Sequence, residues 1–132
     1  MSAVPASVGA ITLFVADPQR AKEFYARVFE LSPVYEDENS AAFKFDNTIV
    51  NLLAAPAAQE LIAPAAVGVE ESNSRCQLTI WVEDTDAVCA ELERRGIALL
   101  NGPIDRPWGL RTASFADPDG HIWEVAAELS GD

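Results

Sequence analysis

The sequence predicts an α+β protein made of two copies of a β-α-β-β-β module. Residues 11–17 return as residues 78–84, and both segments read apolar-Thr-apolar-aromatic-Val-x-Asp. Each segment runs directly into an amphipathic stretch, and shorter apolar stretches follow. The second copy begins 67 residues after the first (78 − 11 = 67), about half of the 132-residue chain, so one supersecondary unit is built twice.

The first module is expected over about residues 9–53. Alternation over 9–16 puts Ile11, Leu13 and Val15 on one face, which is typical of a strand. Asp17 then suits a helix N-cap, and Pro18 suits the first turn. The apolar stripe of this helix consists of Ala21, Phe24, Tyr25 and Val28. Strands follow at about 33–36, 41–45 and 48–53, the last two joined by a tight turn at residues 46–47.

The second module is expected over about residues 76–128, after a linker at about 54–75 with one helical turn near 58–62. Its first strand covers 77–82, and Asp84 or Thr85 caps a helix that ends at Gly96. The stripe of this helix consists of Val88, Leu92 and the stem of Arg95. A short strand at 97–101, a loop at 103–109 and strands at 111–116 and 121–126 complete the module, with turn residues at 117–120.

The helix of each module must cover one face of its sheet, and this assigns the first strands' side chains. The helix-facing side chains are those of Ile11, Leu13, Val15, Leu78, Ile80 and Val82. The opposite side chains are those of Ala10, Thr12, Phe14, Gln77, Thr79 and Trp81. The second set mixes polar and aromatic groups, as expected of a pocket wall.

Composition favours one globular cytoplasmic domain. Of the residues, 49% are hydrophobic, yet no apolar run approaches the roughly 18 residues of a membrane span, and the N-terminus lacks the basic region of a secretory signal. Cys76 and Cys89 form no C-x-x-C pair and are expected to be reduced thiols. The net charge of −12 disfavours nucleic-acid binding, favours solubility, and could steer cationic ligands to the surface.

The chain resembles the vicinal oxygen chelate superfamily of glyoxalases, bleomycin and fosfomycin resistance proteins and extradiol dioxygenases. The resemblance rests on the two strand-to-Asp repeats with their helices, on Phe24 and Tyr25, and on the motif at residues 117–124, and it covers about residues 9–128. It implies paired modules whose mixed sheets curl into a U-shaped cup around a ligand, with the helices outside. It also implies a homodimer, formed side by side or by module exchange.

The resemblance further implies four inward positions at which members of the superfamily hold a metal. In this sequence they are Ala10, Asn51, Gln77 and Glu124. Ala10 has no donor atom, and the two amides are weak donors for Zn²⁺, Ni²⁺ or Fe²⁺. We therefore expect no cofactor and no tightly held metal; a weak divalent ion on Gln77 and Glu124 stays possible.

Glu124 is the candidate catalytic residue, with three readings. It could act as a general base if burial raised its pKa, bind a ligand's cation or donor, or accept a hydrogen bond from Gln77, Asn51 or a hydroxyl. His121, the single histidine, is expected beside the turn on the other face. The candidate ligand-binding residues are Thr12, Phe14, Asn51, Gln77, Thr79, Trp81, Trp108, Arg111, Thr112, Ser114 and Glu124.

These residues leave three functions open. The first is metal-independent binding of a small organic ligand in the cup, as in bleomycin resistance proteins, with aromatic stacking on Phe14 and Trp81. The second is a lyase or isomerase of the glyoxalase type that uses Glu124 as base with a weak divalent metal. The third is a protein whose cup has become packed core and whose role is assembly. A Ser-His-Asp hydrolase has no support, because no serine has a histidine assigned to it.

Overall fold

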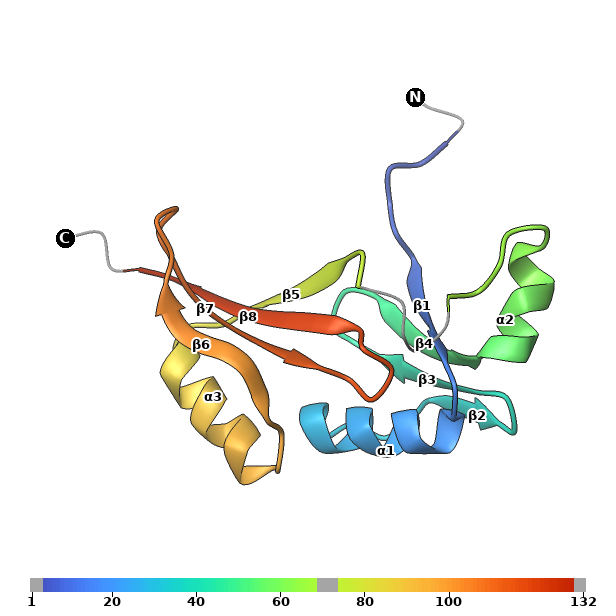
Figure 1. Cartoon of the computed structure of the whole chain (residues 1–132), viewed down its shortest axis with the longest axis horizontal. Helices are drawn as coiled ribbons and strands as arrows, with labels where there is room; N and C mark the ends of the chain where they lie inside the picture. The colour runs from blue at the N-terminus through green and yellow to red at the C-terminus, as the bar shows by residue number, and fades with distance from the viewer. Residues whose placement is uncertain (1–3, 69–73, 130–132) are drawn as a thin grey trace. The chain divides into compact units, whose positions relative to one another are not determined.

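The computed structural model describes residues 4–68 and 74–129, which form the predicted α+β arrangement (Figure 1). The elements of the first half are β1 (Ala10–Val15), α1 (Pro18–Phe29), β2 (Tyr35–Asp37), β3 (Ser40–Lys44), β4 (Ile49–Ala54) and α2 (Ala55–Ile62). The elements of the second half are β5 (Gln77–Trp81), α3 (Thr85–Arg94), β6 (Leu99–Asp105), β7 (Leu110–Ala116) and β8 (Ile122–Glu128). The order β-α-β-β-β therefore occurs twice, as the repeat predicts.

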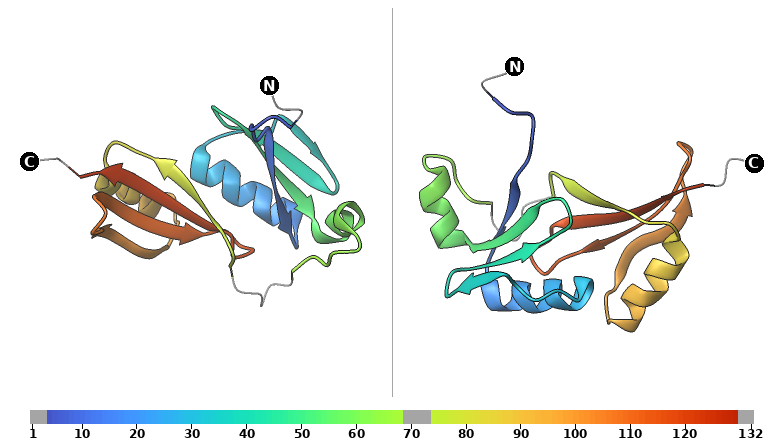
Figure 2. Two further views of the ribbon diagram at one scale, coloured as in Figure 1. Left: turned by 90° about the horizontal axis from the view of Figure 1, so that it is seen from above. Right: turned by 180° about the vertical axis from the view of Figure 1, so that it is seen from behind.

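The two sheets have the same topology. The first has the strand order β1-β4-β3-β2 and the second the order β5-β8-β7-β6. In each sheet the first strand pairs in parallel with the last strand of its module, and the other pairs are antiparallel. Because a helical crossover joins the first strand to the rest, each helix lies against one face of its own sheet, as Figures 1 and 2 show.

Aromatic rings hold α1 against the first sheet. Asp17 caps the helix by accepting hydrogen bonds from the backbone N–H groups of Gln19 and Arg20 at 3.0 and 3.3 Å. Tyr25, fully buried, lies 6.4 Å from Phe43 of β3 between ring centroids, and Phe29 lies 4.7 Å from Phe45. The predicted stripe of this helix is confirmed, since all four of its members are buried.

The helix α3 of the second sheet presents a different stripe from the predicted one. Asp84 is its N-cap and accepts a hydrogen bond from Ala87 N–H at 3.0 Å. The buried residues are Thr85, Cys89 and Leu92, whereas Val88 is only half-buried. Counting from Thr85 in steps of four and three gives this stripe, which contains the predicted Leu92 but has Cys89 in place of Val88. The sheet beneath contributes Phe115 and Trp123, whose rings stack with centroids 6.5 Å apart.

The segment after β4 is more regular than predicted. The expected single turn in the linker is the eight-residue helix α2, because Pro56 falls in its first turn, where a missing N–H costs no hydrogen bond. Gln59 holds the chain that follows α2 through two hydrogen bonds, donating to the Ala65 carbonyl and accepting from Val67 N–H. The rest of the predicted linker includes residues 69–73, which lie outside the described residues.

The strand β6 runs to Asp105, so residues 103–105 belong to a strand and not to the predicted loop. Two register shifts against β7, between Leu99 and Asn101 and between Asn101 and Ile104, accommodate Pro103 in the strand. Gly102 lies within the second shift at φ +92°, and a Cβ there would lie 2.5 Å from the Thr112 carbonyl oxygen. Only glycine fits this close approach between neighbouring backbones.

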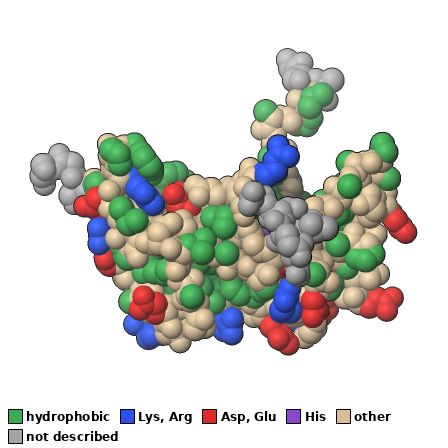
Figure 3. All heavy atoms as spheres, in the orientation of Figure 1, with side chains coloured by type: hydrophobic (Ala, Val, Ile, Leu, Met, Phe, Trp, Pro, Cys, Tyr) green, Lys and Arg blue, Asp and Glu red, His purple; other side chains and the backbone are tan. Residues whose placement is uncertain are grey.

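The chain divides into two compact units, Met1–Gly68 and Val69–Asp132. Within residues 4–68 and 74–129, every helix is too short or too polar to cross a membrane. Both cysteines are free thiols, Cys76 exposed and Cys89 buried, and burial raises the pKa of Cys89. Acidic and basic side chains both occur on the surface seen in Figure 3.

Candidate functional site

The candidate site residues of the first and last strands lie on what we call the distal face, the face of each sheet turned away from α1 or α3. In the first unit Thr12 is opposite Asn51, whose Nδ2 donates to the Thr12 hydroxyl at 3.3 Å. In the second unit Thr79 is opposite Glu124, and the Thr79 hydroxyl donates to Glu124 Oε1 at 3.0 Å. The repeat therefore places one side-chain pair at the same point of both sheets.

The distal face of the first unit is uncharged at this point. Ala10 and Phe14 flank Thr12 on alternate positions of β1, and Ala42 of β3 is opposite Asn51. Phe14 is half-buried, whereas Ala10 and Thr12 are exposed. This face offers a hydroxyl, an amide and an aromatic ring, which can orient a ligand but cannot take up or release a proton near neutral pH.

The distal face of the second unit carries two rows of side chains that cross its four strands. The first row is polar and consists of Thr79, Glu124, Ser114 and Asn101. The second row is largely apolar and consists of Trp81, Ala126, Thr112 and Ile104. Trp81 is 69% exposed, whereas Thr112 is fully buried. A carboxylate and hydroxyls thus lie beside an exposed aromatic ring, as in many ligand sites.

Gln77 lies on the same face as Glu124 but is not its direct neighbour. It is opposite Ile122, two residues before Glu124, and it is exposed. Among the three readings of Glu124, the observed hydrogen bond is the one to a hydroxyl, that of Thr79. Glu124 is half-exposed, so its second oxygen can still meet a ligand.

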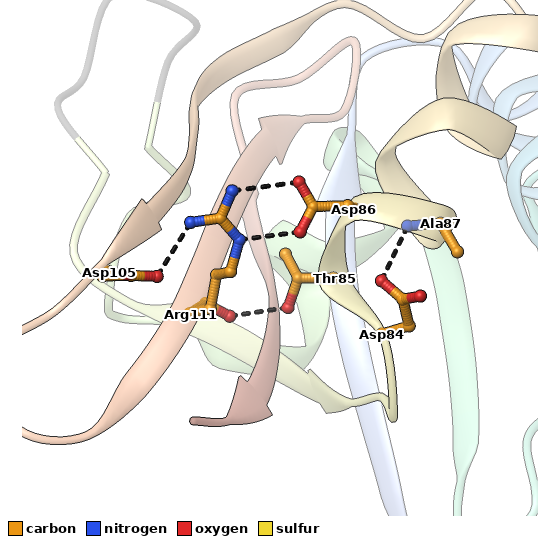
Figure 4. A network of polar contacts seen from close by, with 6 residues as sticks. All are labelled: Asp84, Thr85, Asp86, Ala87, Asp105 and Arg111. Carbon is orange, nitrogen blue, oxygen red and sulfur yellow. Dashed lines mark hydrogen bonds and ion pairs between the residues drawn. The ribbon is translucent and has the colours of Figure 1, made fainter. Parts of the chain in front are cut away.

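Arg111 lies on the other side of the sheet, in a polar network that joins β7, β6 and α3 (Figure 4). Its Nε and Nη2 donate to the two oxygens of Asp86 at 2.7 and 3.0 Å, and Nη1 donates to Asp105 at 2.8 Å. The Thr85 hydroxyl donates to the Arg111 carbonyl at 2.7 Å. These hydrogen bonds raise the pKa of Arg111 and lower that of Asp86, so Arg111 acts as a structural cation.

Arg106 is the cation that the sequence analysis missed. Its Nε donates to the Thr112 hydroxyl at 2.9 Å, and its guanidinium carbon lies 5.9 Å from the centroid of the Trp108 ring. The side chain therefore reaches the distal face, because Thr112 alternates with the helix-facing Arg111 and Ala113. Extending β6 to Asp105 would have revealed this, since Asp105 is opposite Arg111 and Arg106 is the next residue.

His121 is fixed in the turn before β8. Its Nδ1 lies 2.7 Å from Oδ2 of the buried Asp117, whose other oxygen accepts from the backbone N–H groups of Asp119 and His121. The hydrogen bond to Asp117 raises the pKa of His121, and burial opposes it. His121 therefore lies beside the turn, as expected, and its ring is held there by Asp117.

The four positions at which the superfamily holds metals can be tested by their donor chemistry. Ala10 supplies a methyl group, Asn51 and Gln77 supply neutral amides, and Glu124 is the single charged donor. Within residues 4–68 and 74–129, no three His, Cys, Asp or Glu side chains are grouped to share an ion. This set does not match the imidazole and carboxylate ligands that Zn²⁺, Ni²⁺ and Fe²⁺ prefer.

Comparison with known proteins places the chain in a family. The model of the Glyoxalase/Bleomycin resistance protein/Dioxygenase superfamily matches residues 7–125, which include both repeats and the turn motif. The chain belongs to this superfamily. The resemblance seen in the sequence is therefore confirmed over nearly the whole chain.

Solved structures share the fold. A glyoxalase/bleomycin resistance protein/dioxygenase from Nocardioides is 24% identical with a TM-score of 0.88, covering 99% of this chain and 89% of that one. A glyoxalase-related enzyme from Fulvimarina pelagi is 23% identical with a TM-score of 0.80, covering 94% and 89%. A lactoylglutathione lyase from Agrobacterium tumefaciens is 20% identical with a TM-score of 0.75, covering 94% and 95%. At these identities the likeness concerns the fold alone.

Proposed function

We propose that this protein binds a small organic ligand on the distal faces of its sheets without a tightly held transition metal. The observation that carries the proposal is the Thr79–Glu124 pair beside the exposed Trp81. A planar ligand could stack on the indole while Glu124 and Ser114 fix its polar groups. The predicted cup that would bring the distal faces of both modules around one ligand stays a prediction.

The donor chemistry supports metal independence. A catalytic site for Zn²⁺ in proteins typically has three protein ligands, and the four family positions offer one carboxylate and two amides. The neutral Thr12–Asn51 pair of the first unit is already joined by a hydrogen bond, which suits it to orient a ligand more than to grip a cation.

Isothermal calorimetry after exhaustive dialysis against a chelator tests this proposal. A panel of aromatic compounds, cationic antibiotics included, is expected to contain binders whose affinity is the same with and without chelator. Trp81→Ala should weaken that binding by about tenfold, as expected for the loss of an aromatic contact. Leu61→Ala is the matched control, since Leu61 is exposed on α2. Absence of binding across the whole panel would contradict the proposal.

A second candidate is a glyoxalase-type lyase or isomerase with Glu124 as general base. It is favoured by one observation, that Glu124 is the single ionisable group among the four family positions and is oriented by Thr79. Elemental analysis of protein purified without chelators separates the two candidates. Stoichiometric metal that is lost in Glu124→Gln would favour the enzyme and rule out the metal-independent binder.

A further inference from the structure

The hairpin between β6 and β7 fixes the position of Arg106. The backbone N–H of Arg106 donates to the Leu110 carbonyl at 2.7 Å, and Gly109 N–H donates to the Arg106 carbonyl at 3.1 Å. Both hydrogen bonds close the turn that carries Trp108. The hydrogen bond from Nε to the buried Thr112 then sets the direction of the side chain. The guanidinium is therefore preorganised, which reduces the entropy lost when it binds a ligand.

The terminal nitrogens of Arg106 remain available to a ligand. The contact with Thr112 is the one hydrogen bond of this side chain within residues 4–68 and 74–129. Arg111, five residues later, is saturated by two carboxylates, and Arg94 and Arg95 both donate to Glu91. Arg106 differs from these arginines because its half-buried side chain contacts a hydroxyl and an aromatic ring and no carboxylate of the described residues, although the chain has a net charge of −12.

The surroundings of Arg106 suit a planar anion. The ring of Trp108 lies against the guanidinium and is 66% exposed, so a second aromatic group can stack beside it. Ser114 lies two residues along β7 from Thr112 on the same face, and its hydroxyl makes no side-chain hydrogen bond within the described part of the chain. A carboxylate on the paired terminal nitrogens of an arginine is held by two parallel hydrogen bonds.

Glu124 limits what the other end of the ligand can be. Thr112 is opposite Ala126, so Glu124 is its diagonal neighbour across β7 and β8, about 7–8 Å away between Cα atoms. Since Arg106 lies on Thr112, a second carboxylate on the side of the ligand that faces β8 would approach the charge of Glu124. The end of the ligand near Glu124 must therefore be neutral or a hydrogen-bond donor.

We infer that Arg106 determines the ligand class, and that the ligand is a small aromatic monocarboxylate whose anionic group binds the terminal nitrogens of Arg106. This inference rests on the proposed function and names the substrate class for the same distal face. Arg111, one of the candidate ligand-binding residues of the sequence, is paired with Asp86 of α3 and Asp105 of β6 instead. The overall negative charge then serves as a filter, since it repels anions wherever no cation such as Arg106 compensates.

The test compares three matched sets of probes: benzoate, phenylacetate and 3-phenylpropionate, the corresponding amides, and the corresponding primary amines. Binding is measured by calorimetry for the wild type, Arg106→Gln, Arg106→Lys and the control Arg27→Gln. Arg27 lies exposed in the last turn of α1, so its replacement changes the net charge equally. Urea midpoints of all variants are measured in parallel.

At least one acid is expected to bind the wild type more tightly than its amide and its amine. Arg106→Gln should weaken acid binding on the order of 10- to 100-fold and leave amide binding unchanged, as expected for loss of charge-assisted hydrogen bonds. The affinity of Arg106→Lys for the acids should lie between those of the wild type and Arg106→Gln, since lysine keeps the charge but cannot form the two parallel hydrogen bonds of a guanidinium. Arg27→Gln should bind like the wild type.

Two different results would overturn the inference, and they are distinguishable. If amides or amines bind as tightly as acids, or if both Arg106 variants bind acids as the wild type does, the inference fails while the proposed function stands. If no probe of any set and no compound of the earlier panel binds, both fail together. If the urea midpoint falls in Arg106→Gln but not in Arg106→Lys, the affinity of Arg106→Lys for the acids decides whether the inference holds.

Discussion

Aromatic rings hold α1 to its sheet in the first unit, whereas in the second unit a polar network adds to the apolar contacts between α3 and its sheet. Tyr25 and Phe29 contact Phe43 and Phe45 across the first interface. Arg111 joins α3 to β6 and β7 across the second, through Asp86 and Asp105. The strand order of the two units is nevertheless the same. The shared topology therefore comes from the pattern of strands and helices, and different side-chain chemistry can stabilise it.

The largest expected effect comes from the aromatic cluster. Phe43 is 1% exposed, and Phe43→Ala should lower the free energy of unfolding by about 3–5 kcal/mol, through lost apolar burial and the cavity left behind. Urea unfolding followed by circular dichroism measures this. Leu61→Ala, which shortens an exposed side chain on α2, is the control and should change it by less than about 0.5 kcal/mol. A similar loss in both variants would show that the buried aromatic cluster has no special part in stabilising the first unit.

The buried hydroxyl of the polar network should give a smaller effect. Thr85 is 2% exposed, and Thr85→Val keeps its shape but leaves the Arg111 carbonyl without this donor. The expected loss is about 1–3 kcal/mol, the cost of an unsatisfied buried polar group. Thr12→Val, at an exposed hydroxyl, is the matched control. If Thr85→Val proved as stable as the wild type, the hydrogen bond from Thr85 would not contribute to the stability of the second unit.

The two units also differ in the turn before the last strand. Residues 117–121 of the second unit contain the ionisable pair Asp117 and His121, whereas residues 46–47 of the first unit contain no such pair. The pKa of His121 is raised in the folded state by its hydrogen bond to Asp117. The stabilisation is complete below the unfolded pKa of about 6.5 and is lost as the pH rises through the folded pKa. Stability should therefore fall above pH 6.5, and His121→Gln should lack this part of the pH dependence.

Two measurements check that expectation. Proton NMR follows the single imidazole of the chain, and urea unfolding at a series of pH values gives the stability. An imidazole pKa at or below about 6.5 would contradict the proposed stabilisation. So would the same pH dependence in His121→Gln.

The exposed ion pairs of Arg111 should give the smallest effect. Both carboxylate partners are largely exposed, so salt screens these interactions. Arg111→Gln is expected to lower the melting temperature slightly in low salt, and the difference from the wild type should shrink in 1 M NaCl. Arg27→Gln controls for the change in net charge. A decrease that is independent of salt would indicate packing of the arginine stem instead.

Much of the fold could be predicted because the repeat supplies register as well as order. Once two strands begin alike and each pairs with the last strand of its module, Thr12 must meet Asn51 wherever Thr79 meets Glu124. Alternation then assigns Phe14 and Trp81 to the distal face. These placements depend only on local periodicity and on an internal comparison, both of which a single sequence contains.

Alternation with Thr112 also assigns Arg111 to the helix side of β7, whereas the placement of Arg106 could not be predicted in this way. It depends on how β6 pairs with β7, and Gly102 and Pro103 read as the end of a strand where the structure has irregular pairing that continues to Asp105. The extent of α2 was also missed, since a proline near a helix start resembles a break unless the position of the start is known. Both cases need backbone geometry that sequence periodicity does not encode.

The two register shifts of β6 determine which side of the sheet each of its residues faces. Each inserts one extra residue on β6, since residues 99 to 101 span one position of β7 and residues 101 to 104 span two. Together they restore the alternation, so Asp105 meets Arg111 on the helix side and Arg106 emerges on the other. The hydrogen bonds of the turn at residues 106–109 fix this end of the hairpin, so deleting a single residue between Leu99 and Ile104 would remove one shift and exchange the sides of the residues that precede the deletion. Such a deletion would turn the side chain of Leu99 away from α3, while Asp105 and Arg106 would keep their sides of the sheet.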